Sequence, residues 1–166
     1  MNMKKLRIDN INKRSPYKVL QRDDRPDSYY FKSDYDIEFK ITLTFDSTIV
    51  TSGAYMLDIV NATHKASPND IKFRQTLTAI IEEFFEQNND VMLYITETGD
   101  EKQELRNRLF VRWFNTYENN DCFFIRVADG KMEGQNNFMA LLARRDNSRL
   151  AEVIEEFDET VALLFD

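Results

Sequence analysis

Residues 68–96 read PNDIKFRQTLTAIIEEFFEQNNDVMLYIT, and this stretch predicts a helix followed by a strand. Large apolar residues recur in its first part at steps of three and four, which makes one wide apolar stripe along a helix. Ser67 and Pro68 predict where the helix starts, because a hydroxyl caps a helix well and Pro suits the first helical position. Residues 91–96 then form a short apolar run, typical of a strand covered on both faces.

The segment that follows predicts a second helix, a pair of strands and a third helix. Thr98 and Glu101 have the spacing of a capping box, so the second helix should begin there and carry the run ELRNRLFVRWFN, residues 104–115. Strands are predicted over 122–127 and 137–144, joined through a turn at Asp129-Gly130. The last helix, from about residue 148, has an apolar stripe and an almost entirely acidic opposite face.

The residues before position 68 are typical of strands. Within 36–45, Ile37, Phe39, Ile41, Leu43 and Phe45 alternate strictly with polar residues, which predicts a half-buried antiparallel strand. Shorter strand signals cover 17–20, 29–32 and 55–59.

The full order is ββββ-α-β-α-ββ-α. It predicts an α+β fold in which three helices pack on a mixed, largely antiparallel sheet. We expect residues 1–16 to be a basic N-terminal arm, either extended or a frayed helix, and residues 17–166 to be a single α+β domain.

Composition excludes several classes of protein. The formal charge of −7 argues against a duplex-DNA binder that neutralises many phosphates. No apolar run approaches the roughly 20 residues that span a bilayer, and no signal peptide is evident, so we expect a cytoplasmic protein that does not enter the membrane. Basic residues concentrate in 1–25, and residues 150–166 carry only acidic charges. These regions either neutralise each other, within a chain or across an oligomer, or are solvated surfaces.

Motifs for catalysis or metal binding are incomplete. The single His64 and single Cys122 leave too few ligands for a zinc site, and Cys122 falls in a predicted strand, where a thiol is typically a buried hydrophobe. No glycine-rich phosphate loop is present, so we expect neither a metal nor a cofactor. Asp27, Glu38 and Lys40 resemble the Pro-Asp … Asp/Glu-x-Lys signature of a large nuclease superfamily, in which two carboxylates hold Mg²⁺. Alternating Glu, Lys and Thr is also typical of a solvated strand.

The second predicted helix carries the candidate binding residues, which are Arg108, Arg112 and Trp113. Arg108 and Arg112 share a face, and guanidinium groups and aromatic rings are favoured anchors at interfaces. These arginines either pair with glutamates on their own helix or bind a partner. We therefore hypothesise a non-catalytic interaction or ligand-binding domain, whose partner is a protein, a second copy of the chain or a small anion.

Two resemblances accompany this hypothesis. The blocks EEFFEQNNDVMLYIT, RNRLFVRWFN and NNFMALLARRDN, within about 29–157, resemble a small uncharacterised protein family of Bacteroidota. The element order over 55–144 is similar to that of the GCN5-related N-acetyltransferases, which implies an acetyltransferase-like enzyme or a degenerate relative as the alternative function. That family has a Gln/Arg-x-x-Gly-x-Gly/Ala cradle for acetyl-CoA, whereas here Arg74-Gln75-Thr76 is followed by Leu77-Thr78-Ala79.

Overall fold

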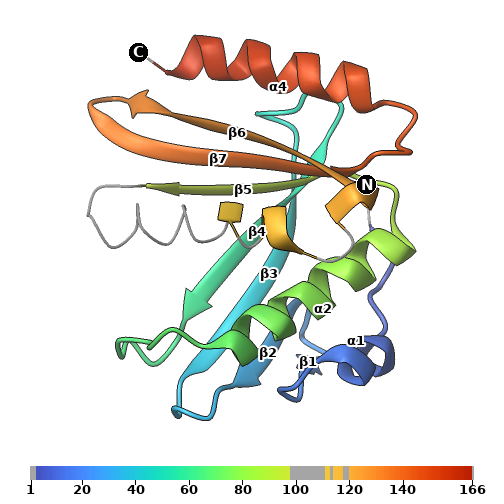
Figure 1. The fold of residues 1–166 in the computed structure, drawn as a ribbon, viewed down its shortest axis with the longest axis vertical. Coiled ribbons are helices and arrows are strands. Elements are labelled where there is room, and N and C mark those ends of the chain that lie inside the picture. The colour runs from blue at the N-terminus through green and yellow to red at the C-terminus, as the bar shows by residue number, and fades with distance from the viewer. Residues whose placement is uncertain (1–2, 98–110, 113, 118–119, 166) are drawn as a thin grey trace. The chain divides into compact units, whose positions relative to one another are not determined.

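The computed structural model describes residues 3–97, 111–112, 114–117 and 120–165 (Figure 1). Its helices and strands are α1 Ile8–Arg14, β1 Leu20–Arg22, β2 Arg25–Lys32, β3 Glu38–Asp46, β4 Ala54–Asn61, α2 Ile71–Gln87, β5 Met92–Glu97, η1 Asn120–Cys122, β6 Phe123–Met132, β7 Gln135–Arg144 and α4 Leu150–Leu164. In this part of the chain the strands follow the order β1-β2-β3-β4-β5-β7-β6. The predicted α+β class and largely antiparallel sheet are confirmed.

The chain divides into two compact units. The first unit is Met1–Thr44 with Leu57–Asn89, and the second unit is Phe45–Met56 with Asp90–Asp166. Strands β3 and β4 contribute residues to both. The prediction of a single domain over 17–166 after a basic arm stays a prediction.

In the first unit, α2 packs its apolar stripe against β2 and β3. The ring of Phe73 lies 5.8 Å from that of Phe31 and 4.5 Å from that of Phe39, measured between centroids. On β3, Phe39, Ile41 and Leu43 are buried in alternation with more exposed residues, as the sequence pattern predicts.

The start of α2 differs from the prediction. Its N-cap is Asp70, whose carboxylate accepts a hydrogen bond of 3.0 Å from the Lys72 N–H, so Ser67 and Pro68 precede the helix. A carboxylate at the cap satisfies an unpaired N–H and favours the positive end of the helix dipole, which explains why the helix begins at Ile71.

The second unit contains β5, β7 and β6 with α4, which lies along β6 and β7 (Figure 1). Register is continuous from Phe123↔Arg144 to Met132↔Gln135. The core between the sheet and α4 is apolar; it includes Val50, Leu93, Met139, Leu141, Val153 and Phe157.

The β6–β7 turn lies four residues later than predicted. Asp129 and Gly130 are within β6, and the connection is Glu133-Gly134, with φ of 53° and 81°. A two-residue hairpin loop with two positive φ angles matches the right-handed twist of its strands, so this turn can extend the ladder past the Asp-Gly pair.

The second predicted helix lies mostly outside the described residues. Residues 111–112 and 114–116 are helical, and the Phe114 side chain is buried. Among the described residues, no helix is long and apolar enough to cross a membrane.

Candidate functional site

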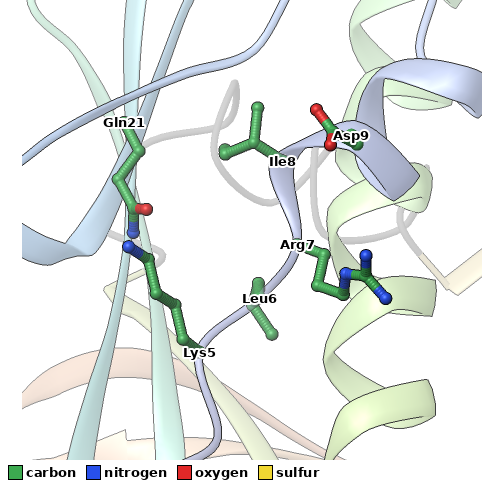
Figure 2. Close-up of a pocket in the computed structure, with 6 residues that line it drawn as sticks. All are labelled: Lys5, Leu6, Arg7, Ile8, Asp9 and Gln21. Atoms are coloured by element: carbon green, nitrogen blue, oxygen red, sulfur yellow. The ribbon is translucent and has the colours of Figure 1, made fainter.

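A depression of about 300 Å³ lies in the first unit, beside the segment that leads into α1 (Figure 2). It is lined by Lys5, Leu6, Arg7, Ile8, Asp9 and Gln21. Five of these are consecutive, and Gln21 comes from β1, so the site depends on how the N-terminal segment is held against the strand.

Buried side chains anchor this segment from both ends of α1. Leu6 is 1% exposed and Ile11 is fully buried. Before the helix, the Lys4 N–H donates to the Asn88 Oδ1 at 2.8 Å, and the Asn88 side-chain amide donates back to the Lys4 carbonyl at 3.3 Å. These contacts fix the backbone that carries the lining residues.

The helix α1 is capped by a residue distant in sequence. Arg7, its N-cap residue, makes no side-chain capping bond. The fully buried Glu83 of α2 instead accepts hydrogen bonds of 3.1 Å from the Arg7 N–H and from the Asn10 side-chain amide. A buried carboxylate with several donors is well satisfied, so Glu83 acts as the cap that the local sequence lacks.

The buried Tyr29 lies next to Gln21, one of the residues that line the depression. Strand register places Gln21 directly opposite Tyr29, so their side chains share one face of the β1–β2 pair. Tyr29 is fully buried, and its hydroxyl has no hydrogen-bond partner among the described residues. The Leu6 backbone and the Gln21 side chain nevertheless interact with the hydroxyl as weak hydrogen-bond donors, and both lower its pKa.

The raised pKa of Tyr29 keeps its hydroxyl neutral at pH 7. Burial raises the pKa of the hydroxyl to about 12, and the negative charges of Asp27 and Glu83 act in the same direction, against the Leu6 backbone and Gln21, which lower it. The hydroxyl therefore keeps its proton at pH 7.

Three of the six lining side chains, those of Lys5, Arg7 and Gln21, carry hydrogen-bond donors. In Figure 2 the Lys5 and Gln21 side chains extend toward each other, and Arg7 extends to the other side of the segment. The Gln21 amide nitrogen also donates to the Pro26 carbonyl at 2.6 Å, which holds that side chain in place. The Lys5 ammonium and the Gln21 amide, which extend toward each other, favour an anionic ligand.

A second polar cluster in the first unit is satisfied internally. The Tyr17 hydroxyl donates to Asp70 at 2.6 Å and accepts from the Asp34 N–H at 3.2 Å, and Lys72 pairs with Asp34 at 2.8 Å. Burial, followed by the hydrogen bond to Asp70, raises the pKa of Tyr17 to about 12. Since each group has a partner, this cluster ties the start of α2 to the β2–β3 connection and leaves little to bind a ligand.

The candidate residues from the arginine helix are only partly described. Arg108 and Trp113 lie outside the described residues. Arg112 is exposed, and its carbonyl accepts a hydrogen bond of 3.1 Å from the Thr116 hydroxyl. Their role in binding stays a prediction.

The nuclease interpretation is wrong on geometry. Register pairs Lys32 with Glu38 and Tyr30 with Lys40, so Glu38 and Lys40 lie on one face of the sheet. Asp27 shares the opposite face with Tyr29 because side chains alternate along β2. In the described part of the chain, no group of three His, Cys, Asp or Glu side chains is placed to hold a metal ion.

The single cysteine and the single histidine lie at exposed positions. Cys122 is exposed and ends the turn η1, so the expectation of a buried strand thiol is wrong. His64 is exposed in a turn with φ of 58°.

The depression itself was missed from sequence. Lys5 and Arg7 were recognisable only as part of a basic N-terminal region. The apolar spacing of Leu6, Ile8 and Ile11 is the signal that could have indicated a packed segment instead of an arm.

The chain matches one protein-family model. Residues 69–159, more than half of the chain, match a family described as "Family of unknown function (DUF6169)", and the chain belongs to that family. No curated protein and no solved structure matches the chain. The expectation of an uncharacterised family is confirmed, whereas its link to Bacteroidota and the resemblance to N-acetyltransferases stay predictions.

Proposed function

We propose that this member of the DUF6169 family is a ligand-binding domain that holds a small anionic molecule in the depression between the N-terminal segment and β1. One observation carries the proposal: the Lys5 and Gln21 side chains, both hydrogen-bond donors, extend toward each other at the depression, beside the buried Tyr29.

The donors define the class of ligand. An oxygen atom placed between the Lys5 ammonium and the Gln21 amide would accept from both. Carboxylates and phosphates offer such oxygens. The volume of about 300 Å³ suits a metabolite-sized anion more than a nucleotide or a peptide.

The test is a titration followed by amide chemical shifts, with inorganic phosphate and succinate as probes at constant ionic strength. We expect one or both anions to shift the amide signals of Leu6, Gln21 and Tyr29 in a saturable way. Lys5→Ala should weaken binding roughly tenfold or more, because it removes a charged donor. Lys65→Ala is the matched control, since Lys65 is an exposed lysine of the same unit that does not line the depression.

Tyr29→Phe separates a binding role from a structural one. If the hydroxyl serves a ligand, this variant binds the anion several-fold more weakly while its free energy of unfolding is unchanged or higher. The proposal is overturned if neither anion shifts these signals, or if Lys65→Ala weakens binding as much as Lys5→Ala.

A second candidate function is the binding of a protein partner through Arg108, Arg112 and Trp113. The exposure of Arg112 supports it, because an exposed guanidinium is available to a partner's carboxylates. Affinity capture with Arg112→Glu and with the control Lys65→Glu tests it: a partner that the first variant loses and the second keeps is the expected result.

A further inference from the structure

The strand β6 lies at the end of the sheet order, and among the described residues no strand pairs with its outer edge. It runs for ten residues without a bulge in its register with β7 and contains no proline. Native proteins usually shorten, bulge or cover such an edge, because its unpaired backbone groups readily accept another strand. A long regular edge therefore points to a pairing role.

The alternation of hydrogen-bonded pairs between β6 and β7 shows which backbone groups of β6 point away from β7. The Arg145 N–H donates to the Cys122 carbonyl at 3.0 Å, which continues the β6–β7 register by one pair. In an antiparallel ladder only alternate pairs exchange hydrogen bonds, so the even-numbered residues of β6 bond to β7. From Ile125 onward, the outward N–H and C=O groups belong to Ile125, Val127, Asp129 and Lys131.

The side chains of these outward residues face away from α4. Arg126 holds Asp158 of α4 in a two-pronged ion pair at 3.1 and 2.8 Å, and Gly130 lies against Phe165 just beyond α4. Because side chains alternate, the odd-numbered residues lie on the other face. Val127, at the centre of the strand, is 36% exposed.

We propose that β6 pairs with β6 of a second copy of this chain, antiparallel and about a two-fold axis at Val127. In that register Ile125, Val127 and Asp129 each meet another of these residues across the axis, so their outward backbone groups find partners. Val127 lies opposite Val127 of the second copy, and Ile125 lies opposite Asp129. A two-fold interface must be self-complementary, and this strand meets that condition.

Charge supports the same occupant and direction. The exposed Lys131 lies near one end of β6, and the exposed Asp121 precedes the other end. Antiparallel pairing brings Lys131 of each copy toward Asp121 of the other, whereas parallel pairing would place like charges together. This proposal does not rest on the ligand site, which uses residues of the first unit.

Sedimentation velocity over a concentration series tests the proposal with a proline substitution. Val127→Pro removes an outward N–H but no bond to β7, so it should keep the fold by circular dichroism and weaken the dimer at least tenfold. Val127→Ala keeps the backbone donor and should weaken it far less. A wild-type protein that stays monomeric at its highest soluble concentration overturns the proposal, as does a dimer unaffected by a folded Val127→Pro.

Exchanging the charges of Lys131 and Asp121 tests the dimer independently if the proline variant does not fold. Lys131→Asp should weaken the dimer, and adding Asp121→Lys to it should restore the affinity. Amide hydrogen exchange adds a finer measurement: protection at Ile125, Val127 and Asp129 should rise with concentration, whereas Arg126 and Ala128 should be protected at every concentration. Equal behaviour of odd and even residues would contradict the pairing.

Discussion

The Tyr29 hydroxyl couples the candidate site to the stability of the fold at high pH. Its pKa is raised from 10.0 to about 12 in the folded chain, mainly by burial. A raised folded-state pKa contributes stability that is complete below the unfolded value and is lost as the pH rises through the folded value. This contribution to the free energy of unfolding is therefore lost between about pH 10 and 12. A pKa difference of two units between the folded and unfolded chain corresponds to about 2.7 kcal/mol.

The first prediction compares Tyr29→Phe with the wild type by urea denaturation at several pH values. Between about pH 9 and 12, the free energy of unfolding should fall about 2–3 kcal/mol further in the wild type than in the variant. Tyr17 has a similarly raised pKa but is present in both proteins, so its effect cancels. Parallel curves for the two proteins would contradict a buried, protonated hydroxyl at this position.

Glycine is needed at position 130 because of packing, and not because of an unusual backbone conformation. A Cβ added there would lie 2.6 Å from Cδ2 and 3.0 Å from Cβ of Phe165, so moving the far end of the ring would not relieve the overlap. This close approach also shows why an Asp-Gly pair stands in mid-strand: the glycine leaves space for an aromatic ring.

The second prediction is that Gly130→Ala destabilises the protein by about 1–3 kcal/mol, the usual cost of overpacking. In a Phe165→Ala background the same substitution should cost much less, since the overlapping ring is gone. Thermal unfolding of the four proteins in this cycle gives the coupling directly. Additive effects would mean that Phe165 does not lie against Gly130 in solution.

At the scale of the element, α1 depends on a residue of α2. A seven-residue helix is too short to be stable alone, and α1 lacks a capping side chain of its own. The carboxylate of Glu83 satisfies the Arg7 N–H and the Asn10 side chain. The position of the residues that line the depression therefore depends on α2.

The third prediction is that Glu83→Ala destabilises the protein by about 2–3 kcal/mol, because buried donors lose their acceptor. Hydrogen exchange at the amides of α1 should speed up more than exchange in the middle of α2. Glu86→Ala is the control: Glu86 is exposed and paired with Arg14, so its loss should cost less than about 1 kcal/mol. Similar costs for the two variants would remove the capping role of Glu83.

Elements with strong periodicity could be predicted, and those defined by distant contacts could not. The alternation in β3 and the stripe of α2 are local patterns, and both elements form where the patterns lie. The local sequence leaves residues 1–16 as either an extended arm or a frayed helix, because α1 is stabilised by Glu83, which is distant in sequence. The β6–β7 turn was misplaced because Asp-Gly is a strong local turn signal, which the ladder and the packing of Phe165 override.

The candidate site could not be predicted for a related reason. Gln21 and Tyr29 become neighbours only through the β1–β2 register, which shifts between Gln21 and Arg22. Composition showed that the N-terminal region is basic, but charge alone does not reveal a depression or a buried hydroxyl. The residues that stand out in sequence, Arg108 and Trp113, lie outside the described residues.

At the scale of the whole molecule, the two proposals draw on different units. The depression uses residues of the first unit, and the outer edge of β6 belongs to the second unit. Variants at one can therefore be made without altering the residues of the other. Ligand titration of Val127→Pro should give the wild-type affinity, and a change there would indicate that assembly and binding are linked.

A distance between the two Glu133-Gly134 hairpin tips would report on the arrangement of the proposed dimer. Glu133 is exposed at this tip, so a spin label on Glu133→Cys, with the exposed Cys122 changed to Ser, should be tolerated. In the antiparallel dimer centred on Val127, Glu133 of one copy reaches the level of Asp121 in the other. At about 3.4 Å per residue, the two labels should then be roughly 40 Å apart along the strands. Pulsed electron paramagnetic resonance reads such a distance, and closely spaced labels would mean that the tips meet.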